Sequence, residues 1–171
     1  MVLKFLALGA IMLTAVPAVA LPESIPSPPT PAPISAKRER PKPCAQGCLN
    51  PIEAVTFASY LGDRAGVAGE FALPIKAVGF EKERVFLNSE TDYRDRNCLT
   101  VVLPMATAKA IAGSADPDAV RKHFEGRRVI VRGIAKQVRI DFTDNGQPTG
   151  KYYYQVHLPV GSPNQIIRLP G

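Results

Sequence analysis

The chain has 171 residues, with 21 Lys and Arg against 15 Asp and Glu, so its net charge is +6 when both histidines are neutral. This length accommodates one ordinary domain and argues against a multidomain enzyme. A charged fraction of 21% beside 46% hydrophobic residues excludes a chain that is disordered throughout.

Residues 1–20 have the parts of a secretory signal peptide. Lys4 is the positive n-region, and residues 5–16 form an apolar stretch that is too short to span a bilayer comfortably. The small residues Ala18-Val19-Ala20 then suit a signal peptidase. We expect cleavage after Ala20 and export to the periplasm or medium, with no integral membrane span afterwards. The alternative is an uncleaved membrane anchor.

Residues 21–49 are predicted to be a proline-rich, partly basic linker. Eight prolines fall between Pro22 and Pro43. Proline fixes φ and removes a backbone donor, so the segment should be an extended spacer. Its basic end could touch an anionic polymer or could simply be solvated. One folded domain is therefore expected over residues 50–171.

The first elements of this domain are a short helix and three strands. Asn50 can cap a helix that runs to about Tyr60, because a proline follows it and Glu53 lies three residues further on. Gly66 and Gly69 indicate a first strand that bends or lies very close to a neighbour. The three predicted strands cover residues 64–73, 84–88 and 98–103.

The second half is predicted to contain one helix and two strands. Asp116 and Pro117 start a helix that ends at Gly126. Alternation of valines with charged residues indicates a strand over 127–140, and its partner is expected over 151–158. Asp144-Asn145-Gly146 is a turn signal within the loop that joins them.

The fold class that follows is mainly β with α. Five strands with a helix between the third and the fourth have the connectivity of an OB-fold, a small Greek-key barrel. The helix that begins near Asn50 would precede this barrel. Closure of a barrel would also protect the edges of so few strands.

Three stretches carry a resemblance to a known family. They are Val85-Phe86-Leu87-Asn88, followed by Tyr93 and by Leu99-Thr100-Val101-Val102-Leu103; residues 124–133; and Pro163-Asn164-Gln165-Ile166. In that order, they resemble the strand–loop–strand pattern, the fourth strand and the closing turn of the exported bacterial OB-fold domains that occur alone or accompany secreted thermonuclease-like proteins. The resemblance covers roughly residues 62–169 and implies an OB barrel that binds a ligand, often described as nucleic acid.

Candidate binding residues follow from where an OB barrel binds its ligands, on its second and third strands and the adjacent loops. Aromatic rings can stack on bases and cations can contact phosphates, and both types occur here. Phe86 is assigned to the core, whereas Tyr93 is expected to be exposed. The cations on this face are Arg84, Arg94 and Arg96. The further aromatic candidates are Phe80 and the tyrosines Tyr152, Tyr153 and Tyr154.

A second candidate is a local basic stripe. Residues 121–139 hold seven Lys and Arg against Glu125 alone. Arg128 and Arg132 share one strand parity, so they should project from the same outward face. Such a stripe is either a contact for an anionic ligand or solvated surface.

The three cysteines leave one thiol over in an oxidising compartment. Cys44 could pair with Cys48 across a short loop. Alternatively, either one could pair with Cys98 and attach the N-terminal arm to the third strand, which is the pairing that we favour slightly.

No catalytic motif, metal site or cofactor site is predicted. Asp92 and Asp95 alternate with arginines, which indicates a solvated, self-paired loop rather than a metal site. The chain is therefore expected to be a noncatalytic exported binding module for an anionic ligand such as single-stranded nucleic acid. The alternative is a cell-envelope module that binds another protein and has no nucleic-acid role.

Overall fold

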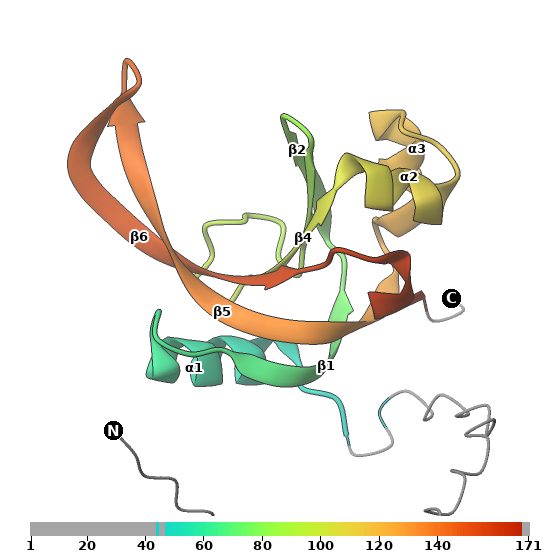
Figure 1. Cartoon of the computed structure of the whole chain (residues 1–171), viewed down its shortest axis with the longest axis horizontal. Coiled ribbons are helices and arrows are strands. Elements are labelled where there is room, and N and C mark those ends of the chain that lie inside the picture. Colours follow the sequence, from blue (N-terminus) through green and yellow to red (C-terminus); the bar gives the residue numbers. More distant parts are fainter. Residues whose placement is uncertain (1–43, 45–46, 169–171) are drawn as a thin grey trace, which may run out of the picture. The chain divides into compact units, whose positions relative to one another are not determined.

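Figure 1 shows the computed structural model, which describes residue 44 and residues 47–168. The predicted signal peptide and most of the predicted linker lie outside the described residues. Within the described part, the chain is mostly β-structure with short helices. No helix there is long and apolar enough to cross a membrane.

Helix α1 (Pro51–Leu61) begins where the sequence predicts. The Asn50 side chain accepts a hydrogen bond from the Glu53 N–H at 3.0 Å, and Glu53 Oε2 accepts one from the Asn50 N–H at 2.8 Å. This reciprocal pair satisfies two backbone donors that a helix start leaves free. Ala54, Val55 and Ala58 are buried, so α1 packs against strands β1 (Val67–Pro74) and β5 (Arg128–Asp144).

The strands form one mixed sheet in the order β1-β5-β6-β4-β3-β2. Strand β2 (Ala77–Glu81) forms a hairpin with β3 (Arg84–Asn88), and β3 pairs with β4 (Leu99–Pro104), both antiparallel. Strand β6 (Gln147–Pro159) lies parallel to β4 and antiparallel to β5. A short strand β7 (Ile166–Arg168) also pairs with β5.

The first predicted strand, over residues 64–73, corresponds to β1, and Ile75 and Lys76 separate it from β2, which was not predicted. The Ile75 N–H donates to the Arg127 carbonyl at 2.8 Å, next to β5, whereas the Lys76 N–H donates to the Asn88 carbonyl at 2.9 Å, on β3. Hydrogen bonding therefore changes from one neighbouring strand to the other between two consecutive residues. The prediction of five strands was wrong as a count because β2 and β7 were not predicted.

The β5–β6 hairpin is longer than predicted. The expected loop over residues 141–150 is mostly strand, and only Asn145 and Gly146 turn the chain. Both have positive φ, 47° and 77°, which is the conformation of a two-residue hairpin turn. Figure 1 shows the end of this hairpin extending away from the rest of the sheet.

Two helices connect β4 to β5. Helix α2 (Met105–Ala112) was not predicted, because no side chain caps it and it follows strand β4 directly. Helix α3 (Pro117–Phe124) was predicted, and the Asp116 side chain accepts from the Ala119 N–H at 2.9 Å. After β6, the turn of 3₁₀ helix η1 (Pro163–Gln165) leads into β7.

The core lies on the inward side of the sheet, between the sheet and the helices. Its largest fully buried side chains include Phe71, Phe124, Leu87, Leu103 and Leu158. These come from β1, α3, β3, β4 and β6, so one core unites all the major elements.

The disulfide joins Cys44 to Cys48, so the pairing with Cys98 that the sequence favoured slightly is wrong. Residues just after Cys48 are held at strand β1, since the Leu49 N–H donates to the Glu70 carbonyl at 2.9 Å. Cys98 is instead buried at the start of β4, with Sγ 3.6 Å from Thr100 Oγ1.

Candidate functional site

A pocket lies on the side of the sheet that faces away from the core. Successive residues of a strand point to opposite faces. Val85 and Leu87 are therefore buried in the core, while Arg84, Phe86 and Asn88 point outward from β3. The same alternation brings side chains of β4, β5 and β6 to this outward face.

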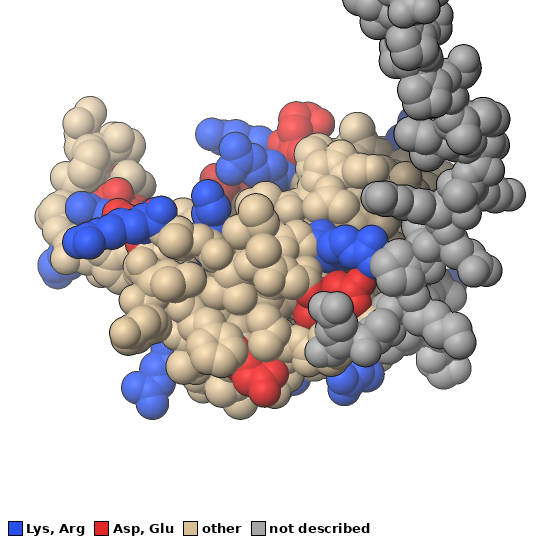
Figure 2. Space-filling view, turned by 60° about the horizontal axis from the view of Figure 1, so that its bottom comes forward, with Lys and Arg blue, Asp and Glu red and all other residues tan. Residues whose placement is uncertain are grey.

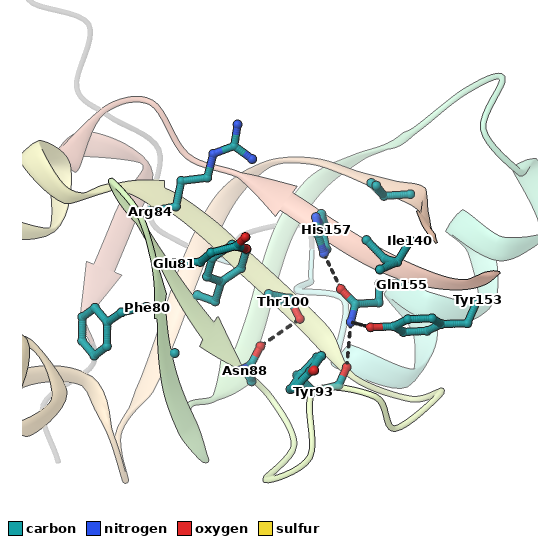
Figure 3. Close-up of a pocket in the computed structure, with 13 residues that line it drawn as sticks. Phe80, Glu81, Arg84, Asn88, Tyr93, Thr100, Ile140, Tyr153, Gln155 and His157 are labelled. Carbon is teal, nitrogen blue, oxygen red and sulfur yellow. Dashed lines mark hydrogen bonds between the residues drawn. The ribbon is translucent and has the colours of Figure 1, made fainter. Parts of the chain in front are cut away.

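The pocket has a volume of about 510 Å³, which is in the range of small-molecule and cofactor sites. Both aromatic and polar side chains surround it (Figure 3). Its walls are formed by Gly79, Phe80, Glu81, Arg84, Phe86, Asn88, Tyr93, Thr100, Val138, Ile140, Tyr153, Gln155 and His157.

Phe86 lines this pocket, so its assignment to the core was wrong. The residue is half-buried, and its ring meets that of His157 edge to face, with the centroids 6.4 Å apart. The cause is strand parity, because Val85 and Leu87 already take the inward positions of β3. Sequence reasoning gave Phe86 to the core because an aromatic residue in a strand fits either face.

Gln155 connects the strand β6 to the loop that carries Tyr93. Its Nε2 donates to the Tyr93 backbone carbonyl at 3.2 Å and to Tyr153 Oη at 3.0 Å. Its Oε1 lies 2.7 Å from His157 Nε2. In Figure 3 the Gln155 amide lies between His157 and Tyr153. One side chain thus positions Tyr93, Tyr153 and His157.

The direction of these hydrogen bonds follows from the groups involved. A backbone carbonyl only accepts, so the Gln155 nitrogen must face Tyr93 and its oxygen must face His157. His157 Nε2 therefore carries a proton and donates to Gln155 Oε1. In the neutral ring, Nδ1 is then an acceptor.

Burial lowers the pKa of His157 from its ordinary value of 6.5, and the positive charge of Arg84 lowers it further. Both effects favour the neutral ring that the hydrogen bonds require. Burial raises the pKa of Tyr153, and the electrostatic effect of Tyr93 raises it further, so the Tyr153 hydroxyl stays protonated. His157 and Tyr153 are therefore neutral polar groups of the pocket near pH 7.

Asn88 and Thr100 form a buried pair on neighbouring strands. Thr100 Oγ1 donates to Asn88 Oδ1 at 2.9 Å, and the two residues are only 2% and 5% exposed. In the parallel register of β4 and β6, Thr100 lies beside His157. A row of polar side chains thus crosses three strands.

The edge of the pocket carries one base and one acid. Glu81 and Arg84 are register partners on β2 and β3, so their side chains lie on the same face. Both are exposed. In the part of the chain that the structure describes, neither belongs to an ion pair within 4.0 Å. Arg84 can therefore meet an anion.

The loop from Ser89 to Asn97 presents Tyr93 to the pocket. Tyr93 is 47% exposed, and the Arg94 guanidinium lies 5.2 Å from the centre of its ring. Arg94 itself and Arg96 are exposed and do not line the pocket. Asp92 Oδ1 accepts from the Arg94 N–H at 2.9 Å, and Asp95 Oδ1 accepts from the Asn97 N–H at 2.8 Å. The loop is self-paired, as predicted.

Arg128 and Arg132 lie apart from this pocket, on the half of β5 that pairs with β1. Both are exposed, in agreement with their shared parity, but Arg132 binds the Glu70 carboxylate. Arg121 and Arg139 of the same basic segment also bind acids. Figure 2 shows one face of the molecule. Most basic residues (blue) there lie near acidic ones (red), and a broad uncharged area lies between these charged groups. The predicted stripe is therefore partly neutralised.

One group of potential metal ligands occurs among the described residues. Cys44 Sγ, Cys48 Sγ and a Glu70 oxygen lie within 4.8 Å of one another. The two sulfurs are joined in the disulfide, so neither can act as a thiolate ligand. Glu70 instead accepts from Arg132 and from the Cys44 N–H, which together lower its pKa. This cluster is a structural connection between the disulfide and the sheet.

Sequence reasoning identified Phe80, Arg84, Tyr93 and Tyr153, which line the pocket, but missed its polar residues on β3, β4 and β6. Asn88, Thr100, Gln155 and His157 lie in predicted strands, and their parity relative to the buried valines and leucines could have indicated the outward face. These side chains come together because β4 pairs in parallel with β6, and the two strands are far apart in the sequence.

Comparison with known proteins yields no family model and no curated protein that matches this chain. Among solved structures, it is similar to the aspartyl tRNA synthetase from Entamoeba histolytica, with 14% identity and a TM-score of 0.34. The match covers 66% of this chain and 22% of the synthetase, so the chain corresponds to about a fifth of that protein.

Proposed function

We propose that this chain is a noncatalytic, exported binding module whose outward pocket binds a single-stranded anionic polymer, with single-stranded nucleic acid as the preferred candidate. The observation that carries this proposal is the pocket itself. It combines Phe86, Tyr93 and Tyr153 with an arginine, Arg84, that has no acidic partner among the described residues. Bases stack on aromatic rings, and phosphates pair with guanidinium groups.

The fold that we propose for this module is a five-stranded OB-like barrel of the kind found in exported bacterial OB-fold domains. In this description, β1 and β2 are two halves of one bent strand. The exchange of hydrogen-bond partners at Ile75 and Lys76 supports it, since β1 pairs with β5 and β2 pairs with β3. The order of strands would then be continuous around the barrel. The pocket would lie on the face that such barrels use for ligands.

The charges at the pocket make the test specific. An anionic ligand gains from Arg84 but is repelled by its neighbour Glu81. Replacing each one should therefore change affinity in opposite directions. Arg128 provides a matched arginine that is exposed on the sheet but outside the pocket.

The experiment is fluorescence anisotropy of a labelled oligothymidylate with the mature protein at several salt concentrations. We expect binding that weakens with salt, is weaker in Arg84→Ala and is tighter in Glu81→Gln. Arg128→Ala should lose less affinity than Arg84→Ala. Absence of binding at low salt would exclude nucleic acid as the ligand. Equal losses in the two arginine variants would place the contact outside the pocket.

A second candidate is a cell-envelope module that binds another protein. The observation that favours it is the outer part of the β5–β6 hairpin, where Phe142, Tyr152 and Tyr154 are each nearly half exposed. Tyrosine is enriched at protein interfaces. A photo-crosslinking residue at Tyr154 should then capture one envelope protein in cells, and the crosslink should persist in Arg84→Ala. Loss of the crosslink in Arg84→Ala would argue against this candidate.

Export is the remaining part of the proposal. It is supported by the signal-peptide pattern of residues 1–20 and agrees with the Cys44–Cys48 disulfide, since such bonds persist in oxidising compartments. Mass spectrometry of the protein from fractionated cells should find a chain that begins at Leu21, outside the cytoplasm. A cytoplasmic chain that retains Met1 would contradict export.

A further inference from the structure

His157 can change its charge while keeping its contact in the pocket. The ring is partly buried, lines the pocket and meets the ring of Phe86 edge to face. Its Nε2 donates to Gln155 Oε1, so a second proton can be added only at Nδ1. The bond to Gln155 survives this addition, because Nε2 is a donor in the neutral ring and in the charged ring alike.

The nitrogen that would take up the second proton is open to solvent. Within the described part of the chain, the hydrogen bond of His157 is at Nε2, and Nδ1 has no partner. No described side chain has a nitrogen or oxygen that is both fully buried and without a partner. His157 Nδ1 is therefore accessible, and a molecule in the pocket can lie close to it.

The charged side chains that face His157 are mainly cations. On β5, Lys136 is the register partner of His157, so the two side chains share one face of the sheet. On β4, the neighbour of His157 is the neutral Thr100, and beyond it Arg84 faces the pocket from β3. Glu81 of β2 is the acid that lines the pocket, and it is the register partner of Arg84.

His157 consequently has no anionic partner among the described residues. No carboxylate there lies within 4.0 Å of its nitrogens. The other titratable groups of the pocket are the phenols of Tyr93 and Tyr153. Burial and the charge of Arg84 lower the pKa of His157, so the ring is neutral near pH 7 in the absence of an anion.

An anion that binds at Arg84 would favour the charged ring. It would offset the positive charge of Arg84, which disfavours protonation of His157, and its own negative charge would attract a proton to the ring. Linkage is reciprocal, so a charged His157 must in turn strengthen binding of the anion. Figure 3 shows Arg84 and His157 at the same pocket.

We infer that His157 is a second cation of the binding site, and that an anionic polymer binds there together with a proton taken up at His157 Nδ1. This inference rests on the proposed function, because it concerns how the same pocket holds its ligand. Affinity should increase as the pH falls from the pKa of His157 in the complex to its lower pKa in the free protein, which lies below 6.5.

The experiment measures binding of labelled oligothymidylate to the mature protein by fluorescence anisotropy at constant salt. Thymine does not titrate in weak acid, so a pH effect belongs to the protein. We expect affinity about tenfold higher at about pH 5.5 than at about pH 8, an ordinary coupling between two ligands. His157→Phe should bind equally at both pH values. His123→Gln is the matched control and should keep the difference, since His123 is the second of the two histidines and does not line the pocket.

A second pair of measurements requires no variant. NMR titration of the His157 ring should give a higher midpoint with saturating oligothymidylate than without it. Calorimetry near pH 7 in two buffers of different ionisation enthalpy should show that binding takes up protons. These measurements decide the matter if His157→Phe fails to fold by circular dichroism.

The outcomes separate the inference from the proposed function. Binding of equal affinity at the two pH values would overturn the inference and leave the proposed function standing. A pH effect that persists in folded His157→Phe, or an NMR midpoint that the oligomer does not raise, would have the same consequence. Absence of binding at low salt at either pH would overturn the proposed function and the inference with it.

Discussion

The side chain of Gln155 donates a hydrogen bond to the backbone carbonyl of Tyr93 at 3.2 Å, across 62 residues of sequence. This contact attaches the loop from Ser89 to Asn97 to strand β6 and holds the Tyr93 ring at the pocket. The same amide orients His157. The arrangement of the pocket thus depends on one neutral side chain at its centre.

Replacing this side chain should loosen the loop. We expect Gln155→Leu to lower the free energy of unfolding by about 1 kcal/mol, the net value of a typical hydrogen bond. Amide hydrogen exchange in residues 89–98 should become faster. Gln147→Leu is the matched control, since Gln147 is exposed on the same strand and has no side-chain hydrogen bond among the described residues. Similar exchange rates in the two variants would show that Gln155 does not hold the loop.

His157 should make stability depend on pH. Its pKa in the folded protein lies below the ordinary 6.5, because burial and Arg84 disfavour the charged ring. Between these two pKa values the unfolded chain binds a proton that the folded chain does not. The free energy of unfolding should therefore be fully retained above pH 6.5 and should fall as the pH decreases toward the folded pKa.

Urea unfolding at a series of pH values measures this effect. The part of the slope that belongs to His157 should disappear in His157→Phe, which has no titrating ring. NMR titration of the His157 ring should give a midpoint below 6.5. An unchanged slope in His157→Phe, or a midpoint above 6.5, would contradict the prediction.

The cysteines should differ in reactivity and in their effect on stability. Cys98 is buried, so a thiol reagent should label no cysteine in the native, oxidised protein and one after unfolding. Replacing both Cys44 and Cys48 by Ser should lower the free energy of unfolding by about 2 kcal/mol, because the disulfide closes only a short loop. Rapid labelling of Cys98 in the native protein would show that β4 is not packed as described.

Two glycines of the first predicted strand form a matched pair. A Cβ at Gly66 would lie 2.4 Å from Ile134 Cγ2 and 3.0 Å from the Ala135 carbonyl oxygen, whereas a Cβ at Gly69 would meet nothing closer than 3.8 Å. Gly66→Ala should therefore lower the free energy of unfolding by about 1–3 kcal/mol. Gly69→Ala should be tolerated, and thermal unfolding distinguishes the two. Equal melting temperatures would exclude close contact at Gly66.

Local signals in the sequence correctly indicated several elements. Asn50 and Glu53 cap α1, Asp116 caps α3, and Asn145-Gly146 turns the long hairpin. Each signal acts within a few residues, through hydrogen bonds or backbone conformation, so it can be read without knowing the rest of the fold. Helix α2 was missed because it has no such side-chain cap.

What the sequence by itself determined is most of the local elements, the alternation along each strand, and the selection of Arg84 and Tyr93, which both line the pocket. The tertiary structure decided that Arg132 is neutralised by Glu70, 62 residues away, and which polar side chains meet in the pocket. The physical reason is that these outcomes depend on which distant strands lie side by side. The parallel pairing that brings Thr100 beside His157 joins residues 57 positions apart, and no local preference encodes that distance.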